Sequence, residues 1–230
     1  AVAQAKAGEG VPVYVRVDLM RDLLGLLTLA NHRHVILVGD AGVGRRSLVS
    51  ALSLLMAEGK GPVGLTKLVQ VTENALLVDA EKAIDSAYQQ ARDGILFIPN
   101  IERFFGSAMS SPEFPKATRP VQRAFLSLSP VVIASTTDAA WNERLAVDSV
   151  VRDHSHRMRV PEPAIDETVA ILGVHRSRLE QDYGFKILDS ALPAAATLAK
   201  RYVAGATLPA SALAALHRAG ALLKLAGQSS

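Results

Sequence analysis

Short apolar runs alternate along the chain with longer segments in which apolar residues recur at helical spacing. The short runs are rich in Val and Ile and stop at or before Gly, Pro or Ser, as is typical of strands buried on both faces of a parallel sheet. We predict these strands at 35–38, 95–98 and 131–135. We predict helices at 17–30, 45–57 and 82–92. Strands that alternate with helices indicate a three-layer α/β/α domain with a parallel sheet.

The pattern changes at residues 161–163, where two prolines flank a glutamate. Prolines restrict the backbone and suit a boundary between domains. Beyond them Ala and Leu dominate, and the helical spacing predicts helices at 166–183, 189–202 and 209–226. The Ser- and Pro-rich stretch 106–120 is predicted to be a mobile surface loop. We expect three parts, namely a linker at 1–11, an α/β domain at 12–162 and a small helical domain at 163–230.

Composition excludes several classes of protein. The 230 residues carry 25 basic and 22 acidic side chains, a net charge of +3, so we expect no nucleic-acid partner. The chain has no cysteine, which excludes disulfides and thiolate ligands and fits the cytoplasm that we expect. No apolar run reaches the roughly 20 residues of a membrane span, and the start lacks the pattern of a signal peptide. Since the chain does not begin with Met, we expect a fragment or a processed product.

The segment 34–52 carries the strongest functional signal. A predicted buried strand runs into a turn with Gly39, Gly42 and Gly44 and then into a predicted helix. Glycines let backbone N–H groups curl around phosphate oxygens, and the helix N-terminus adds positive potential. This context predicts a phosphate-loop fold.

The charged end of this loop departs from the complete motif, which ends in Gly-Lys-Ser/Thr. Arg45 stands at the lysine position, and arginine is bulkier, planar and differently aimed. Arg46 stands where a hydroxyl would bind magnesium, and its charge would repel that ion. Ser47 follows one residue late. We therefore expect ATP or ADP to bind weakly or not at all, and we expect no magnesium.

A second nucleotide signal would be a buried strand that ends in Asp-Glu. The predicted strand 95–98 ends instead in Pro99 and Asn100. Proline offers neither a charge nor an N–H for the ladder. The Asn100 amide can hold a water molecule but cannot take its proton. The alternative interpretation is that 95–98 is only a core strand, in which case the missing acids mean nothing.

Further motifs follow in a characteristic order. Tyr-Val-Arg lies at 14–16, Ala-Ser-Thr-Thr at 134–137, Glu-Pro-Ala-Ile-Asp-Glu-Thr-Val-Ala-Ile-Leu at 162–172, Ala-Ala-Ala-Thr-Leu at 194–198, Arg-Tyr at 201–202 and Leu-Pro at 208–209. In order and spacing the chain resembles the first AAA+ domain of the ClpB, ClpA and ClpC disaggregases and unfoldases, from residue 13 to about 225. The resemblance implies a AAA+ large α/β domain followed by a small helical lid.

The departures from this family fall on its catalytic positions. Pro99 and Asn100 replace the family's Asp and Glu, while Thr136 resembles its sensor-1 residue. Asp153 and His154 stand where the resemblance places paired arginine fingers, with Arg152 and Arg157 nearby but out of register. The lid motif at 208–212 loses its Lys. The substrate-gripping pore loop of the family corresponds to 77–82, which is short and has no aromatic residue.

Three hypotheses follow. The first is a pseudo-ATPase AAA+ domain, not an enzyme, that acts as a structural or regulatory module beside other AAA+ subunits or another protein. The second is a nucleotide-sensing module, with Tyr14, Val15 and Ile171 beside the base and Arg45 and Arg46 beside the phosphates. The third is an active ATP-dependent chaperone in which Ser47 binds magnesium after a one-residue shift.

Other patterns are interpreted without a functional role. The stretch 153–156 is predicted to be an exposed polar turn rather than a metal site, and 31–34 a solvated loop. Trp141 is predicted to pack the helix after the strand 131–135. The apolar face of 209–226 fits an ordinary core, with docking on a neighbouring subunit as the alternative. No membrane partner is expected.

Overall fold

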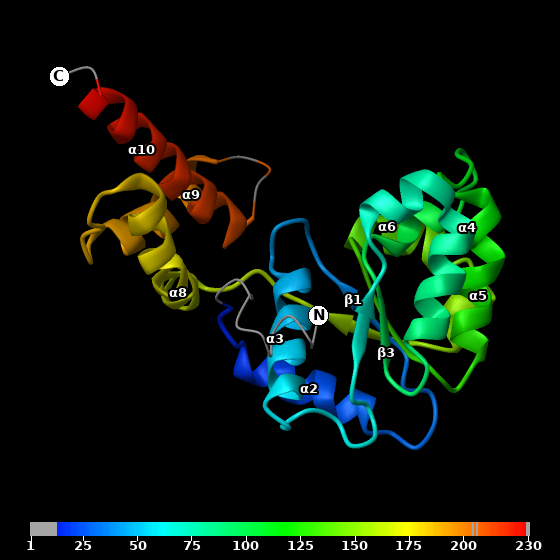
Figure 1. Cartoon of the computed structure of the whole chain (residues 1–230). Coiled ribbons are helices and arrows are strands. Elements are labelled where there is room, and N and C mark those ends of the chain that lie inside the picture. Colours follow the sequence, from blue (N-terminus) through cyan, green and yellow to red (C-terminus); the bar gives the residue numbers. More distant parts are fainter. Residues whose placement is uncertain (1–12, 204, 206, 229–230) are drawn as a thin grey trace. The chain divides into compact units, whose positions relative to one another are not determined.

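A computed structural model of the chain describes residues 13–203, 205 and 207–228 (Figure 1). The predicted linker 1–11 lies outside the described residues. The chain forms two compact units. Of the described residues, the first unit holds 15–39 and 48–159, and the second holds 13–14, 40–47 and the chain from 160 onward. Each unit is described by itself.

The first unit is built on a parallel sheet, which the described residues form with five strands in the order β2-β3-β4-β1-β5. The strands are β1 Val35–Val38, β2 Leu68–Gln70, β3 Ile95–Ile98, β4 Val131–Thr136 and β5 His156–Arg159. Every residue of the three central strands is buried, which confirms the strands predicted at 35–38, 95–98 and 131–135. The predicted α/β fold class is therefore confirmed.

Helices cover both faces of this sheet. The helices are α2 Val17–Leu27, α3 Arg45–Ala57, α4 Glu73–Gln90, α5 Thr118–Leu126, α6 Asp138–Ala140 and α7 Ser149–Asp153. Figure 1 shows α2 and α3 on one face and α4 and α5 on the other. Short 3-10 turns lie at Ile101–Phe104 and Pro115–Ala117, and a π turn lies at Trp141–Leu145. The three-layer arrangement leaves the loops at the carboxyl edge of the sheet to build a site.

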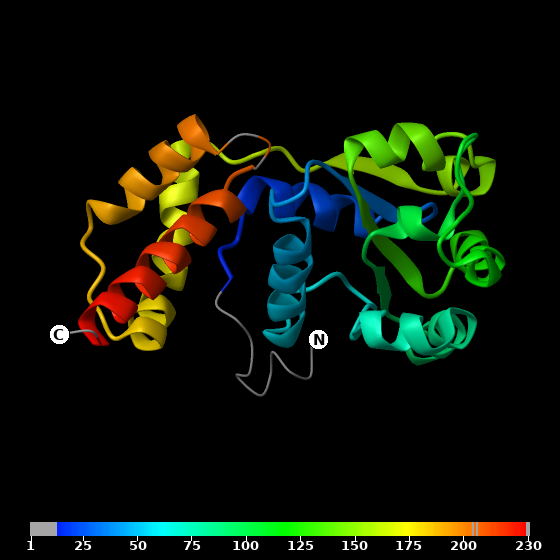
Figure 2. The same cartoon turned by 90° about the horizontal axis from the view of Figure 1, so that it is seen from above.

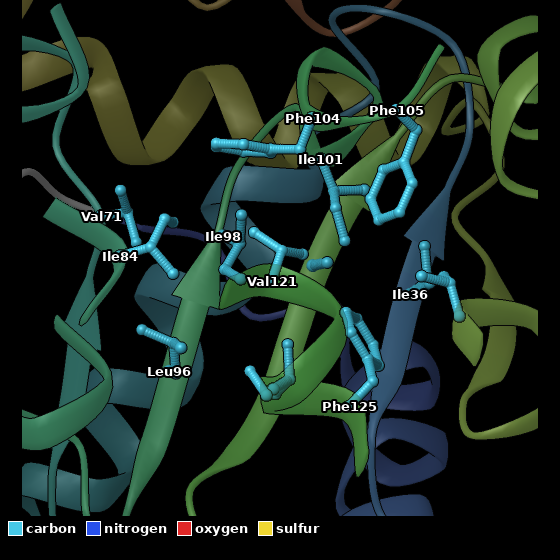
Figure 3. Packing of buried hydrophobic residues seen from close by; sticks show 14 of the residues in the cluster. Ile36, Val71, Ile84, Leu96, Ile98, Ile101, Phe104, Phe105, Val121 and Phe125 are labelled. Carbon is cyan, nitrogen blue, oxygen red and sulfur yellow. The ribbon is translucent and has the colours of Figure 1, made fainter. Parts of the chain in front are cut away.

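The core on the α4 and α5 side joins alternate strand residues to helix residues. Ile36, Leu96 and Ile98 face Ile84 of α4 and Phe125 of α5, and all are fully buried (Figure 3). Complete burial of such a side chain contributes about 1.5–3 kcal/mol. Trp141 belongs to the same cluster, so its predicted packing role is confirmed.

The second unit contains three long helices among its described residues, α8 Ile165–Tyr183, α9 Ala191–Tyr202 and α10 Ala210–Gln228. They agree with the predictions at 166–183, 189–202 and 209–226 to within two residues at each end. Figure 2 shows them packed side by side. Their core joins Leu172, Leu192 and Leu208 to small alanines such as Ala196 and Ala212.

Helix α4 starts earlier than predicted. The sequence predicted a helix only from residue 82, whereas α4 begins at Glu73 and includes the stretch 77–82 that was expected to be a loop. The helix is kinked at Asp79, whose backbone leaves the helical region at φ −158° and ψ 97°. Its Oδ1 accepts the Lys82 N–H at 3.1 Å, so Asp79 caps the second half of a kinked helix.

Three predicted loops or turns are also corrected. Residues 118–120 of the stretch 106–120 form the first turn of α5, where Pro120 needs no N–H partner. His156, expected in a polar turn, begins β5 and is half-buried. His34, expected in a solvated loop, is buried, with its Nε2 2.8 Å from the Ser127 carbonyl and its Nδ1 accepting the Val132 N–H at 2.9 Å.

Candidate functional site

The carboxyl edge of the sheet brings together residues from β1, β3 and β4. The parallel register pairs Val38 with Thr136, so Gly39 leaves the sheet beside the end of β4. The Gly39 N–H donates to the Thr136 carbonyl at 3.3 Å. Asn100, just beyond β3, donates its backbone N–H to Ser135 Oγ at 3.4 Å. Thus Gly39, Asn100 and Thr136 lie at one edge of the sheet.

The end of β3 adopts a special backbone conformation. Pro99 directly follows Ile98, the last residue of the ladder, so its missing N–H falls where strand pairing stops. Asn100 has φ 51° and ψ 53°, a left-handed conformation that Asn tolerates better than most residues. The strand therefore delivers an amide, not a carboxylate, to the edge.

Two buried oxygens at the ends of these strands stand out. Thr136 Oγ1 and Glu102 Oε2 are buried and have no hydrogen-bond partner within the described part of the chain. Glu102 lies in the 3-10 turn that follows β3. A buried polar atom of this kind calls for a water molecule or a ligand. Glu102 was not among the residues predicted from the sequence, because an acid two positions after Asn100 becomes a candidate only once its Oε2 is known to be buried.

The turn between β1 and α3 has the backbone of a phosphate loop. Gly42 and Gly44 have φ values of 94° and 96°, where side chains are disfavoured. Helix α3 begins at Arg45, directly after the second of these glycines, and runs for 13 residues. The predicted succession of strand, glycine turn and helix is therefore confirmed, and Arg46 and Ser47 are exposed in the first turn of α3.

Residues 40–47 group with the helical unit. Thr207 donates its Oγ1–H to the Ala41 carbonyl. A Cβ atom on Gly42 would lie 2.9 Å from Ala210 Cβ and from Thr207 Oγ1, which is closer than such atoms approach. Gly42 is therefore required both by its φ angle and by the space around it.

Glu162 of the Glu-Pro motif has a structural role inside the helical unit. Its Oε1 accepts the Leu208 N–H at 2.8 Å, and its Oε2 accepts a hydrogen bond from Lys200. Burial disfavours the charged carboxylate, but the Leu208 N–H and Lys200 outweigh it and hold the pKa of Glu162 below its usual value. Glu162 thus ties the start of α8 to α9 and to the segment before α10.

The predicted arginine-finger positions lie elsewhere in the first unit. His156 of β5 pairs with Val35 at the start of β1, so the preceding Asp153 and His154 lie at the amino edge of the sheet. Arg152 donates to both carboxylate oxygens of Asp153, at 2.8 and 3.1 Å. The structure therefore does not bring Asp153 or His154 to the edge that holds Gly39.

Arg157 also has partners within the first unit. It donates to Asp138 Oδ1 at 2.8 Å and lies 5.4 Å from the centre of the Trp141 ring.

The residues predicted to border a base are divided between the units. Val15 is half-buried in the first unit, and Tyr14 and Ile171 are half-buried in the second. Their role beside a base stays a prediction.

Arg103 fixes the start of α4, which precedes the stretch 77–82 that corresponds to the pore loop. It donates to Glu73 at 2.6 and 2.8 Å and to Glu113 at 2.7 and 2.6 Å, and its guanidinium lies 4.7 Å from the centre of the Phe114 ring. These bonds hold the pKa of Glu113 below its usual value. The start of α4 is therefore tied to the chain around 113. Leu77, 67% exposed, lines a hollow of about 440 Å³ between them.

Neither a metal cluster nor a membrane helix occurs in the described residues. Across 13–203, 205 and 207–228, no three His, Asp or Glu side chains gather closely enough to hold a metal ion. Among the same residues, no helix combines the length and the apolar character that crossing a membrane requires.

Comparison with known families matches the helical part of the chain. Residues 164–230 match the model of the AAA lid domain. Over nearly its whole length the chain is similar to the chloroplastic chaperone protein ClpB2 of Oryza sativa, with 28% identity over 97% of this chain and 24% of the relative. It is also 28% identical to the chaperone protein ClpB of Leptolyngbya boryana, over 96% of this chain and 27% of the relative. The chain thus spans about a quarter of these relatives.

Solved structures agree with this likeness. The closed-state cryo-EM reconstruction of Hsp104 with ATPγS and FITC casein superposes with a TM-score of 0.86 and 26% identity, over 99% of this chain and 41% of that chain. The Saccharomyces cerevisiae Hsp104–ADP complex gives a TM-score of 0.85 at 26% identity, over 99% of this chain and 41% of that chain. The similarity covers both units of the present chain.

Proposed function

We propose that the chain, a AAA+ domain of the Clp/ClpB type, is a non-hydrolysing module that supports a chaperone or unfoldase assembly. The observation that carries this proposal is the end of β3. Pro99 and Asn100 occupy the positions from which an Asp would support magnesium and a Glu would polarise the attacking water. Neither residue can bind a proton from water at neutral pH.

The sizes of the expected losses in reaction rate support the same proposal. General acid–base help contributes about 10²–10⁴ in rate, and an arginine finger contributes about 10³–10⁵. Asp153 and His154 occupy the finger positions implied by the family, and Arg152 and Arg157 hydrogen-bond carboxylates of their own unit. Such losses do not add simply, but either alone makes turnover negligible.

The hydrophobic cores that hold the fold together, in contrast, are intact. The central strands are buried throughout, and both units have their own cores. This combination supports a structural or regulatory role, for which we propose other AAA+ subunits as partners. The absence of cysteine supports a reducing compartment, and we propose the cytoplasm.

A second function, nucleotide sensing without hydrolysis, is favoured by the glycine turn. Gly42 and Gly44 retain the left-handed backbone of a phosphate loop, directly before the 13-residue helix α3. Arg45 and Arg46 add positive charge at that helix N-terminus, which suits phosphate oxygens. In this case the module holds ADP or ATP and reports its presence to the assembly.

The two functions are distinguished by a steady-state ATPase assay and by calorimetry on the purified chain. We expect no magnesium-dependent ATP turnover above the protein-free background. Heat of binding with ADP or ATP that disappears in Arg45→Ala would support the sensing module, and no heat at millimolar nucleotide would leave the structural role alone.

Glu102→Gln is the decisive control for hydrolysis. If the chain hydrolyses ATP and both Arg45→Ala and Glu102→Gln remove that activity, Glu102 takes over the role of the missing acid and the proposal of a non-hydrolysing module is wrong. Turnover unchanged in both variants would identify a contaminating ATPase and would leave the proposal standing.

A further inference from the structure

The helical unit has an open apolar hollow at the end of the bundle that its core does not fill. Buried residues such as Leu172 and Leu192 pack the other part of the unit. Towards the C-terminal ends of α8 and α10 (yellow and red in Figure 2), a hollow of about 200 Å³ opens between these helices and the segment 184–191. Phe185, Leu188 and Leu223 line it and are 38%, 71% and 56% exposed. Apolar side chains that are exposed together in this way are candidates for an interaction site.

A second hollow of about 200 Å³ adjoins the first, and most of its lining residues carry a titratable side chain. Leu179 lines both. The polar side chains of the second hollow are His175, Arg178 and Asp182 from α8 and His217 from α10. Arg178 lies 3.9 Å from Asp182, and both are about half exposed, so this ion pair is weak and leaves Arg178 able to bind another anion.

His217 can act as a donor, and His175 lies in the same hollow. Tyr183 Oη lies 2.9 Å from His217 Nδ1. When the hydroxyl donates to Nδ1, neutral His217 carries its proton on Nε2 and offers that N–H to a ligand. Burial, together with Arg178 and His217, lowers the pKa of His175. His175 is therefore neutral at pH 7 and accepts a proton readily only when an anion is close.

Charges around the two hollows favour an anionic ligand. Arg178 lines the second hollow against Asp182, and Lys224, whose Nζ donates to the Asp182 carbonyl at 3.1 Å, adds a second cation beside it. The nearby carboxylate of Glu180 is already bound by Arg176, by Lys186 and by the Ile187 N–H. A ligand that enters both hollows therefore meets apolar carbon at one end and donors at the other.

We propose that the two hollows together form a docking groove for a segment of another protein in which a large aliphatic side chain lies beside a carboxylate. The apolar hollow accepts the aliphatic side chain, and Arg178 with the two histidines accepts the carboxylate. An apolar anchor with an adjacent charge is how short protein segments commonly gain both affinity and specificity. This docking groove does not depend on whether the glycine turn holds a nucleotide.

Fluorescence anisotropy with two labelled amphipathic peptides tests the proposal. In the first peptide leucines are flanked by glutamates, and in the second each glutamate is replaced by lysine. We expect the full chain to bind the acidic peptide at least about tenfold more tightly than the lysine peptide. Arg178→Glu should reverse this preference, since it replaces the cation that faces the carboxylate.

Leu223 and Leu222 provide a matched pair of variants. They are neighbours on α10 with exposed fractions of 56% and 59%, but only Leu223 lines the apolar hollow. Leu223→Glu should weaken binding of the acidic peptide by at least about tenfold, and Leu222→Glu should leave it within about twofold. Circular dichroism of both variants confirms that α10 remains folded.

Four outcomes would overturn the proposal. Equal binding of the two peptides would show adhesion to an apolar surface, and equal loss in the two leucine variants would place the contact elsewhere. Failure of both peptides to bind at about 1 mM would exclude the groove. Sedimentation velocity tests the fourth outcome, because self-association that Leu223→Glu abolishes would identify a second copy of the chain as the occupant.

Discussion

His34 shows how one buried side chain makes stability depend on pH. Its Nδ1 accepts the Val132 N–H, so the proton of the neutral ring lies on Nε2 and is donated to the Ser127 carbonyl. Protonation of Nδ1 would break the first of these bonds. Burial, with smaller contributions from Arg33, His154 and His32, lowers the pKa of His34 from 6.5 to about 4.

The sign of the effect follows from proton uptake. Between pH 6.5 and about 4 the unfolded chain binds a proton at His34 and the folded chain does not. Stability from this residue is therefore complete above pH 6.5 and is lost as the pH falls. We expect a loss of about 2 kcal/mol in the free energy of unfolding between pH 7.5 and pH 5.

Urea denaturation at the two pH values measures this loss. His34→Asn removes the titrating group, so its stability should fall less on acidification than that of the unmodified chain. Identical pH dependence in both proteins would assign the acid sensitivity to other groups.

At the residue scale, the sequence could not predict the burial of His34. Its neighbours Asn31, His32 and Arg33 are polar, which indicated a solvated loop. Its partners lie 93 and 98 residues away in the chain, so only the folded sheet brings them together. Gly42 and Gly44 were predictable, because a phosphate loop requires glycine for local backbone reasons.

At the scale of elements, two helix glycines differ in what surrounds them. A Cβ atom on Gly173 of α8 would meet nothing within 4 Å. A Cβ atom on Gly220 of α10 would lie 2.7 Å from Tyr183 Cδ2 and 2.8 Å from its Cγ. Alanine favours the helix at both positions, but at Gly220 it collides with a ring that also bonds His217.

We therefore expect the same substitution to have opposite effects. Gly173→Ala should raise the free energy of unfolding by about 0.5–1 kcal/mol. Gly220→Ala should lower it by about 1–2 kcal/mol, since overpacking outweighs the gain in helix propensity. Urea denaturation followed by circular dichroism measures both, and stabilisation by both substitutions would show that Tyr183 moves aside freely.

Strands were predicted in the centre of the sheet and missed at its edges. The strands β1, β3 and β4 are buried on both faces, so their sequences are continuous apolar runs. The edge strands β2 and β5 are only partly buried. The sequence of β5, His-Arg-Met-Arg, contains a single apolar residue, and its pairing with β1 could not be inferred from composition.

At the scale of the whole molecule, the two units differ in the size of the side chains that pack their cores. The first unit packs Phe, Ile and Leu side chains around its sheet. The second relies largely on alanines between a few leucines. Small side chains remove less apolar area from water, and small units bury less of their surface. We expect the helical unit to unfold first.

The chain has one tryptophan, which reports on the first unit alone. Trp141 is 7% exposed in the core of the α/β unit, whereas circular dichroism sees the helices of both units. In urea, part of the helical signal should be lost before tryptophan fluorescence changes. Leu172→Ala, at a residue with 0% exposure, should remove about 2–5 kcal/mol and shift only the early transition. If the fluorescence and circular dichroism transitions coincide in the unmodified chain and also in Leu172→Ala, the two units unfold as one.

The sequence predicted the helices and the central strands better than it predicted the contacts between them. The helices of the second unit and the absence of acids at Pro99 and Asn100 could be read directly. Glu102 was missed because its importance depends on burial, which no local pattern revealed. The carboxyl and amino edges of the sheet, which separate Asn100 from Asp153, follow only from strand order.

The end of β3 also limits what evolution can do with this chain. A glutamate at position 100 would adopt the left-handed conformation that Asn100 has now, at a strain of about 1–2 kcal/mol. It would then still lack the neighbouring aspartate and the lysine of the glycine turn. If the proposed non-hydrolysing function holds, a single substitution at position 100 therefore does not rebuild the set of catalytic residues that the family resemblance implies. Hydrolysis would require substitutions at the end of β3 and in the glycine turn together.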